Sequence, residues 1–277
     1  MIWGKKWQRK NKLFFALFRY YKSILLGDSM SKLNGKIALI TGGNSGIGFA
    51  IAKQFIQEGA SVIITARRKT QLDEAVKELG EKATAFVADV SKPEELSSLY
   101  EMIQDKFGRL DIIAANAGTG EFQSLGEITE ESYYKTFDTN VKGVIFTVQK
   151  ALPILSPSAS IIITGSTVSV SGTPAFSVYS ASKSAVRNLV RSWVIDLKGK
   201  GIRINVLSPG VTETPGLLGL AEPGKEEELL ASFASQIPLG RAAKPKEMAT
   251  VAVFLASDDA SYVNGVELFV DGGMVQI

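Results

Sequence analysis

The sequence predicts an α/β fold in which one parallel sheet carries helices on both of its faces. From Lys36 onward, short β-branched runs alternate with longer segments of helical pattern, and this alternation indicates successive βαβ units. The runs IALI, VII and IIIT are apolar at consecutive positions, which is typical of strands buried on both faces. The prediction is therefore a doubly wound parallel sheet of seven strands.

Each expected strand is a short β-branched run: KIALIT (36–41), SVIIT (61–65), ATAFVA (83–88), LDIIAA (110–115), SIIIT (160–164), IRINVLS (202–208) and VELFV (266–270). The expected helices are the longer segments between these runs, at 46–58, 70–79, 93–107, 130–154, 177–199 and 246–256. Residues 212–238 are the least regular part, because Pro and Gly interrupt a leucine-bearing stretch that ends in an acidic helix. An insertion after the carboxyl end of a strand is expected to lie over the ligand crevice.

The chain is expected to form one domain over 30–277, preceded by a basic extension at 1–29. No repeat, low-complexity tract or linker divides residues 36–277, although 277 residues are enough for two domains. The extension holds seven basic residues against Asp28, and its apolar run LFFALF is too short for the ~18 residues of a membrane span. The extension is either a basic amphipathic helix on an anionic membrane surface, or a segment without a role that dangles from the domain or results from the choice of start site; we expect a segment without a role. We accordingly expect a cytoplasmic enzyme.

Two residue types are missing, and their absence excludes whole classes of chemistry. The chain has no histidine and no cysteine, so it has no Ser-His-Asp triad, imidazole base, thiolate nucleophile, disulfide or Cys/His metal site. Acid/base chemistry must then come from Tyr, Lys, Asp, Glu or a cofactor. Outside the extension, 24 basic residues face 27 acidic ones, which gives no basic surface for nucleic acid.

A glycine-rich loop, TGGNSGIG at 41–48, follows the first expected strand and opens the first helix. Gly42, Gly46 and Gly48 allow a sharp turn, a close approach to a pyrophosphate and tight helix–strand packing, while the helix N-terminus offers free N–H groups. The alternative is a tight turn that binds nothing. The position of the loop favours a dinucleotide site, with Asn44, Ser45 and Ile47 as further contacts.

The end of the second strand favours NADP(H) over NAD(H). An NAD site usually places an acid there to bind the ribose 2'-hydroxyl, but this strand ends in Thr65-Ala66-Arg67-Arg68. An arginine pairs with a 2'-phosphate, which a carboxylate would repel. The alternative is that Arg67 and Arg68 are solvated turn residues, in which case NAD(H) remains possible.

Small and polar residues end the next two strands. Asp89 and Val90 end the third, and Asn116, Ala117 and Gly118 end the fourth. Both positions lie at the crevice, where such residues can contact an adenine edge or let the cofactor approach, although each alone is also ordinary turn chemistry.

The acid/base candidates are Tyr179 and Lys183, which are four residues apart on one face of the helix expected at 177–199. A phenol has a pKa of about 10, and a nearby ammonium favours the tyrosinate, so we expect Lys183 to lower the pKa of Tyr179. Ser166 closes the fifth strand and places a hydroxyl at the same rim. A tyrosine and a lysine four residues apart are common by chance. The pair indicates a site only because Ser166 is expected at the same rim.

The ordered set of motifs resembles the short-chain dehydrogenase/reductase family from about Lys36 to the C-terminus. The motifs are TGGNSGIG, Asp89, NAG at 116–118, TNVKG with Asn140, ITGS with Ser166, YSASK at 179–183 and PGVTET at 209–214. The resemblance implies a single-domain Rossmann fold with strand order 3-2-1-4-5-6-7, and a dimer or tetramer. GRAAKPKE at 240–247 and DGG at 271–273 also match, and we interpret both as structural.

The resemblance also implies residue roles. Tyr179 would give a proton to the nascent alkoxide, Ser166 would bind the carbonyl oxygen, and Asn140 would hold a water that links Lys183 to solvent. Lys183 would lower the tyrosine pKa and bind the nicotinamide ribose, so Tyr179 and Lys183 also contact the cofactor. The nicotinamide end would be held by Pro209, Gly210, Val211, Thr212 and Thr214.

The substrate is less defined. Family reductases that act on carrier-protein thioesters typically follow NAG with residues like ITRD, whereas this chain has TGEF, with Glu121 at the pocket mouth. Apolar residues expected near the pocket suit a hydrophobic ketone: Phe122, Val168, Phe176, Leu217, Leu218 and Leu220. The leading hypothesis is an NADPH-dependent ketone reductase or alcohol dehydrogenase. The alternatives are an NAD-dependent sugar or polyol dehydrogenase and a non-catalytic dinucleotide-binding protein.

Overall fold

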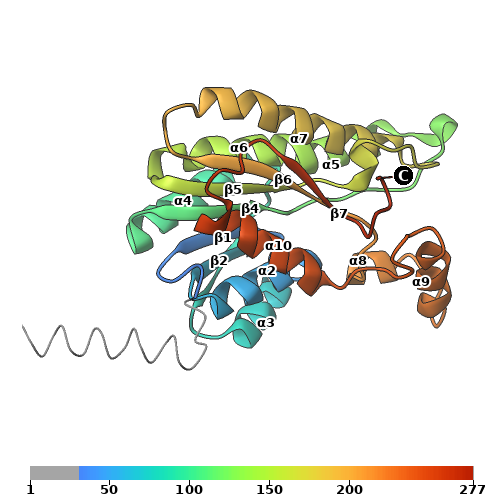
Figure 1. The fold of residues 1–277 in the computed structure, drawn as a ribbon, viewed down its shortest axis with the longest axis horizontal. Coiled ribbons are helices and arrows are strands. Elements are labelled where there is room, and N and C mark those ends of the chain that lie inside the picture. The colour runs from blue at the N-terminus through green and yellow to red at the C-terminus, as the bar shows by residue number, and fades with distance from the viewer. Residues whose placement is uncertain (1–30, 277) are drawn as a thin grey trace, which may run out of the picture.

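A computed structural model describes residues 31–276, which form one sheet between two layers of helices (Figure 1). Within these residues the sheet has seven strands in the order β3-β2-β1-β4-β5-β6-β7, and every neighbouring pair is parallel. The predicted fold class and strand order are therefore confirmed. The extension at 1–29 lies outside the described residues, so the structure tests neither interpretation of it.

The strands match the β-branched runs closely. Their bounds are β1 (Ile37–Thr41), β2 (Ser61–Ala66), β3 (Ala83–Val87), β4 (Leu110–Ala115), β5 (Leu155–Thr164), β6 (Arg203–Pro209) and β7 (Glu267–Val270). The exception is β5, which begins before the apolar run. Leu155 pairs with Leu110, and the register then shifts so that Ser160 pairs with Ile112. The polar segment between them adds to the strand without adding to the apolar pattern, so the sequence did not indicate it.

Helices cover both faces of the sheet and create two hydrophobic cores (Figure 1). One layer contains α2 (Gly46–Gln57), α3 (Lys69–Leu79) and α10 (Pro245–Ala256); the other contains α4 (Pro93–Phe107), α6 (Gly143–Ala151) and α7 (Ser177–Asp196). Successive residues of each strand enter opposite cores: in β1, Ala38 and Ile40 pack in the first and Leu39 in the second. Burial on both faces explains the continuous apolar runs.

The helix expected at 130–154 is interrupted, which corrects the prediction. It consists of α5 (Glu130–Phe137), a π-helical segment at 138–142 and α6. The wider turn carries Asn140, whose side chain is fully buried and hydrogen-bonded to other parts of the chain. Single π-helical turns of this kind often occur at functional sites. The apolar periodicity continues through the break, so the sequence pattern does not reveal it.

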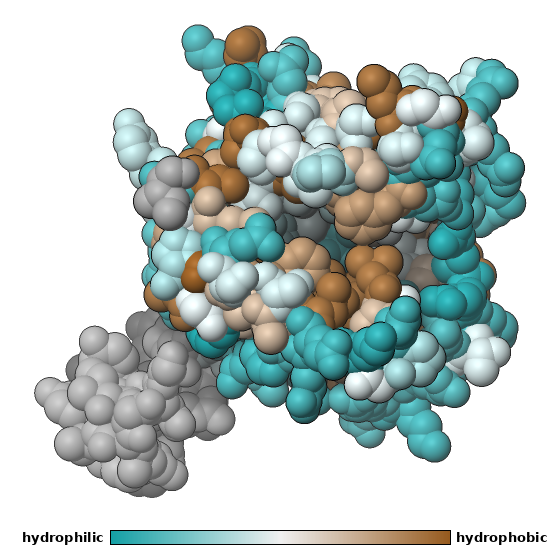
Figure 2. Space-filling view, turned by 90° about the vertical axis from the view of Figure 1, so that its right-hand side faces the viewer, coloured by the Kyte–Doolittle hydropathy of each residue, from teal (hydrophilic) through white to brown (hydrophobic). Residues whose placement is uncertain are grey.

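The insertion after β6 forms α8 (Pro215–Leu218) and α9 (Glu226–Ala234), at the edge of the molecule where β6 and β7 end (Figure 1). Figure 2 views this edge and shows a hollow near its centre, bordered by a mixture of hydrophobic and hydrophilic residues. Among residues 31–276, no helix is both long and apolar enough to cross a bilayer.

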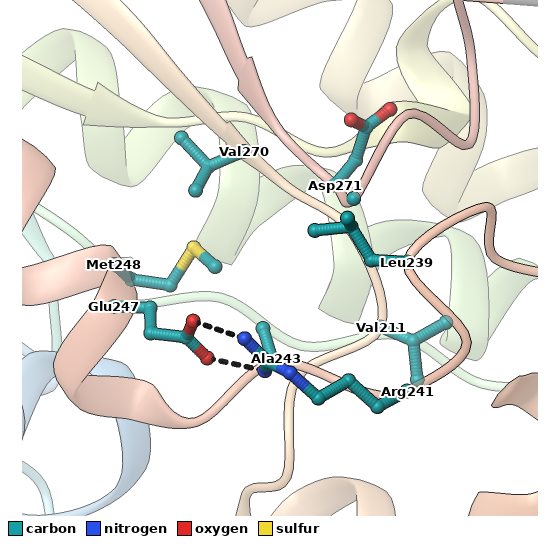
Figure 3. Close-up of a pocket in the computed structure, with 9 residues that line it drawn as sticks. Val211, Leu239, Arg241, Ala243, Glu247, Met248, Val270 and Asp271 are labelled. Atoms are coloured by element: carbon teal, nitrogen blue, oxygen red, sulfur yellow. Dashed lines mark hydrogen bonds and ion pairs between the residues drawn. The ribbon is translucent and has the colours of Figure 1, made fainter.

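The two C-terminal motifs have structural roles, as the sequence indicated. Arg241 donates two hydrogen bonds to Glu247, at 2.8 and 2.7 Å, which together with the Lys244 N–H hold the pKa of Glu247 at about 2 (Figure 3). Asp271 accepts from the Gly273 and Val275 N–H groups, both at 2.9 Å. The cavity of about 90 Å³ beside this ion pair is smaller than typical ligand pockets and far too small for a dinucleotide.

Candidate active site

The glycine loop has the backbone geometry of a phosphate cradle. Gly42 and Gly46 have φ values of 65° and 54°, which L side chains rarely adopt. A Cβ at Gly48 would lie 2.3 Å from the Gly42 carbonyl oxygen, so a side chain there would push the helix away from the loop. Gly43, which was not among the predicted contacts, is also restricted, because its Cβ would lie 2.6 Å from Ile64 Cγ2.

The start of α2 leaves donors for an anion. Ser45 is the residue before the helix, its backbone is extended, and its hydroxyl makes no capping hydrogen bond. The hydroxyl and the first N–H groups of α2 can therefore bind a phosphate. Asn44 instead donates a 3.2 Å hydrogen bond to Gln71 on α3, which fixes one wall of the cradle. These residues fit a dinucleotide pyrophosphate.

Arg67 and Arg68 are exposed in the turn between β2 and α3. In residues 31–276 neither side chain makes an ion pair, whereas the adjacent Lys69 pairs with Asp73 at 2.6 Å. The two guanidinium groups are thus available to an anion.

The residues that follow β3 and β4 differ in the polar atoms that they leave free for a ligand. Asp89 uses one carboxylate oxygen to accept from the Ser91 N–H and hydroxyl, at 2.9 and 2.8 Å, which leaves the other oxygen for a ligand. Asn116 and Ala117 donate backbone hydrogen bonds of 3.0 Å to the Thr41 hydroxyl. The Asn116 amide also donates to the Thr41 carbonyl at 3.2 Å, so Asn116 joins β1 to β4.

Val90 and Gly118 are placed by packing against catalytic elements. Val90 is buried, and its side chain fills the space where a Cβ on Gly143 of α6 would lie. A Cβ on Gly118 would lie 3.5 Å from Lys183 Nζ and 3.4 Å from Asn140 Oδ1. Gly118 thus lies directly beside the acid/base candidates.

The stretch 209–214 crosses from β6 to the glycine loop. Gly210 is explained by packing, because its Cβ would lie 2.7 Å from Asp271 Cα. The Thr212 hydroxyl donates a 3.0 Å hydrogen bond to the Gly210 carbonyl, so this contact lies within the stretch itself. Thr214 caps α8 by accepting from the Leu217 N–H at 3.2 Å. Its methyl group lies 3.3 Å from the Cβ position of Gly46, so this end of the stretch borders the cradle.

Four polar candidates come together at the carboxyl ends of β4 and β5. Ser166 begins a short turn after β5, and its side chain is near enough to Tyr179 to lower the pKa of the tyrosine. Tyr179 and Lys183 project from one face of α7, with Lys183 Nζ 5.5 Å from the centre of the tyrosine ring. Lys183 Nζ also donates to the Thr164 carbonyl at 2.8 Å, a contact that the sequence did not indicate.

Asn140 links the β4 loop to α7. Its Oδ1 accepts from the Thr119 N–H and its Nδ2 donates to the Thr119 carbonyl, both at 2.8 Å. Nδ2 also donates to Ser182 Oγ at 2.9 Å. The side chain therefore fixes the loop against the helix that carries Tyr179 and Lys183, and the water-holding role implied by the family resemblance stays a prediction.

The electrostatics differ from the sequence-based expectation. Burial raises the pKa of Tyr179 to about 12, and the hydrogen bond from Ser166 offsets only part of this effect. Burial lowers the pKa of Lys183 to about 8. The net fall in the pKa of Tyr179 that the sequence predicted is wrong for the protein alone, because the loss of solvation outweighs the effect of the nearby charge. Tyr179 is therefore protonated at neutral pH, the form that can donate a proton.

Three aromatic rings form a stack that starts at Tyr179. The Phe176 ring lies 4.4 Å from the Tyr179 ring, and the half-exposed Phe122 ring lies 4.3 Å from Phe176. The Gln123 N–H donates to the Ala175 carbonyl at 2.7 Å and joins the two loops that carry these rings. Phe122 and Phe176 were expected near the pocket, but their stacking on the tyrosine was not.

The other residues expected near the pocket make no contact with Tyr179 comparable to that of Phe176. The Val168 N–H donates to Ser166 Oγ at 3.4 Å, so Val168 adjoins the candidate serine. Leu217 and Leu218 lie on α8, and Leu220 just beyond it is half exposed. These leucines lie at the rim of the site, and the structure gives no contact between them and Tyr179.

We expect Gly120→Ala to lower kcat about 10- to 100-fold. The added Cβ would lie 2.5 Å from Tyr179 Cδ2, so the tyrosine ring must move from its position beside Ser166. Gly126→Ala in the same loop is the matched control, because its Cβ would meet nothing within 4 Å. Equal steady-state kinetics for the two variants would show that the ring position does not matter.

Fold and site together are those of a dinucleotide-dependent oxidoreductase. A family model described as enoyl-(acyl carrier protein) reductase matches residues 42–275. The chain belongs to the short-chain dehydrogenase/reductase family, and it is an NAD(P)-dependent enzyme that acts on CH–OH or carbonyl groups.

Curated relatives resemble the chain over nearly their whole length. The chain is 47% identical over 251 residues to "Oxidoreductase asL5" of Sarocladium schorii, covering 90% of this chain and 99% of the relative. It is 39% identical over 249 residues to the 3-oxoacyl-[acyl-carrier-protein] reductase FabG of Thermotoga maritima, covering 88% and 99%. It is 35% identical over 247 residues to a 3alpha-hydroxysteroid dehydrogenase of Mediterraneibacter gnavus, covering 87% and 97%.

Proposed function

We propose that the chain interconverts a ketone and a secondary alcohol, with NADP(H) as the favoured cofactor and Tyr179 as the acid/base. The observation that carries this proposal is Tyr179, whose loss of solvation keeps its hydroxyl protonated at neutral pH and which lies near enough to Ser166 for the serine to lower its pKa. A proton donor beside a second hydroxyl is the arrangement that a developing alkoxide requires.

The chain's own residues orient and protonate the substrate. Ser166 donates a hydrogen bond to the carbonyl oxygen, and Tyr179 Oη gives that oxygen its proton as negative charge develops there. Lys183, as an ammonium below pH 8, holds ribose hydroxyls and favours the tyrosinate that remains. The bound cofactor supplies or accepts the hydride.

We propose that the cofactor lies along the carboxyl edge from the glycine loop to Lys183. Its pyrophosphate faces Ser45 and the N-terminus of α2, Asp89 faces the adenine, and Thr214 borders the cradle near Gly46. The support is the cradle that side chains would fill and the unused Ser45 hydroxyl. Arg67 extends this site to a 2'-phosphate.

We expect Arg67→Ala to weaken NADPH binding about 10- to 150-fold and to leave NADH nearly unchanged, because one charge-assisted hydrogen bond contributes roughly 1.5 to 3 kcal/mol. Fluorescence titration of both cofactors measures this. Ala66→Asp is the converse change: it adds an acceptor for the ribose and repels the phosphate, so preference should shift to NADH. Lys69→Ala, which breaks only the pair with Asp73, is the control. If Arg67→Ala weakens both cofactors equally, Arg67 is a solvated turn residue and NAD(H) is favoured.

We propose a hydrophobic ketone as the substrate class. The Phe122 and Phe176 rings leading to Tyr179 support this, and one relative is named as a hydroxysteroid dehydrogenase. Glu121 forms an ion pair with Lys135, so the acid at the pocket mouth is neutralised rather than presented to substrate. A carrier-protein thioester and a sugar or polyol are the competing substrate classes.

A panel of aryl ketones, cyclic ketones, β-keto esters and sugars, assayed with NADPH and NADH, tests these proposals. Fastest turnover of a cyclic or aryl ketone with NADPH supports them. Fastest turnover of a sugar with the NAD pair would favour the alternative dehydrogenase. Location in the cytoplasm and assembly into a dimer or tetramer stay predictions from the sequence and the family.

A further inference from the structure

A buried carboxylate on the edge strand β7 makes three polar contacts with side chains of other elements. Glu267 Oε1 accepts from Ser169 Oγ at 2.6 Å and from Ser208 Oγ at 2.8 Å. Its Oε2 lies 2.5 Å from Arg187 Nε, an ion pair in which neither atom makes a hydrogen bond. The Glu267 side chain is only 9% exposed, so these contacts replace nearly all of its solvation.

Two of the contacts hold the turn that carries Ser166. The Ser169 N–H donates to the Ser166 carbonyl at 3.0 Å, so Ser169 closes the turn that Ser166 begins. On the other side, a Cβ on Gly165 would lie 2.3 Å from Ser208 Oγ, so the Ser208 hydroxyl packs directly on the residue before Ser166. The carboxylate therefore binds one hydroxyl on each side of Ser166.

The third contact holds the helix that carries the acid/base pair. Arg187 lies on the same face of α7 as Tyr179 and Lys183, one turn beyond the lysine. Ser184 adds a second tie between helix and turn, because its hydroxyl donates to the Ser169 carbonyl at 2.8 Å. Glu267 thus touches both elements whose separation sets the distance between Ser166 and Tyr179.

We propose that Glu267 is a positioning residue, which fixes the Ser166 turn against α7 and so sets the geometry of the two hydroxyls at the carbonyl oxygen. Backbone pairing joins β7 to β6 without this side chain. A buried ion pair is seldom the most stable choice at such a position, whereas the hydrogen bonds from Ser169 and Ser208 to the carboxylate are short and directional. Misplacing catalytic groups by about 1 Å can cost ~100-fold in rate. The inference rests on the roles proposed above for Ser166 and Tyr179.

The test compares Glu267→Ala and Ser169→Ala on the ketone of the panel that the wild-type chain reduces fastest. We expect Glu267→Ala to lower kcat about 10- to 100-fold while the NADPH Kd stays within about threefold, because the cofactor cradle lies on other elements. Ser169→Ala should lower kcat less, and it should cost almost nothing further in the Glu267→Ala background, because the link is already broken.

Asp111→Asn is the matched control. Asp111 is also buried, binds Arg109 at 3.2 Å and accepts from the Ile37 N–H at 2.8 Å, but it lies near the start of the central strand β4, away from the carboxyl ends of the strands that carry the site. We expect it to lower the melting temperature comparably and to leave kcat unchanged. If Glu267→Ala and Asp111→Asn lower kcat equally, or if Glu267→Ala leaves kcat intact, the positioning role is wrong.

Two further results keep the outcome decisive. If Glu267→Ala does not fold, Ser169→Ala decides alone, because it leaves the ion pair in place and unchanged kcat would overturn the proposal. Tyr179→Phe is measured in parallel. Retained turnover in Tyr179→Phe would refute the proposed function, whereas its loss together with normal turnover in the Glu267 and Ser169 variants would refute only the positioning role.

Discussion

Replacing Tyr179 by Phe is expected to abolish nearly all turnover while leaving cofactor binding close to that of the wild type. The change removes one hydroxyl and keeps the ring, so the stack with Phe176 and the packing against Gly120 persist. The lost group is the proposed proton donor, which lies near Ser166, and positioned acid/base groups contribute ~100- to 10,000-fold to rate. Steady-state kinetics on a confirmed ketone, with NADPH titrations, measure both quantities.

The control for this variant is Tyr133→Phe. Tyr133 is also stacked on an aromatic ring, that of Phe137, but it lies exposed on α5. We expect it to retain full activity. If Tyr179→Phe keeps more than about a third of the wild-type kcat, another group supplies the proton, since the expected loss is at least ~100-fold.

Much of the fold follows from local pattern. The runs that became β1, β2 and β4 are continuous and apolar because helices cover both faces, and this burial makes strands easy to recognise in the sequence. The π-helical break at 138–142 is not recognisable in this way. It depends on the hydrogen bonds of Asn140 with Thr119 and Ser182, which join segments that are distant in the sequence.

In the site, too, local sequence pattern predicts some features, whereas others depend on tertiary contacts. The spacing of Tyr179 and Lys183 places both residues on one helix face, and no tertiary information is needed to predict this. The direction of the tyrosine pKa shift was predicted wrongly, because spacing reports the nearby charge but not the burial that outweighs it. The contact between Glu267 and Arg187 had no sequence signal, since neither residue belongs to a motif and only β7 packing brings them together.

Replacing Lys183 by Met is expected to damage the enzyme in two measurable ways. Turnover should fall by about 100-fold or more, because Tyr179 loses the nearby ammonium that favours its tyrosinate. The NADPH Kd should rise about 10- to 150-fold, because charged hydrogen bonds to the ribose disappear. Unchanged Kd together with lost turnover would remove the ribose-binding role and leave only the effect on Tyr179.

The same substitution is expected to stabilise the cofactor-free protein at neutral pH. Burial lowers the pKa of Lys183 to about 8, whereas an unfolded lysine titrates near 10.4, so holding the charge in the folded state costs about 3 kcal/mol. Below pH 8 this cost is present in full. Between pH 8 and about 10.4 the unfolded chain binds more protons, so wild-type stability rises and the advantage of the variant fades.

Methionine also removes the 2.8 Å hydrogen bond to the Thr164 carbonyl, which is worth about 1 kcal/mol, so the net gain at pH 7 is about 2 kcal/mol. Thermal melts at pH 7 should then show a melting temperature about 4 to 8 °C higher than that of the wild type. Melts near pH 10.5 should show no gain. Lys200→Met, at an exposed position beyond the end of α7, should have no such pH-dependent effect. A variant less stable than the wild type at pH 7 would mean that Lys183 does not lose its proton near pH 8, and that other contacts at the site offset the burial of its charge.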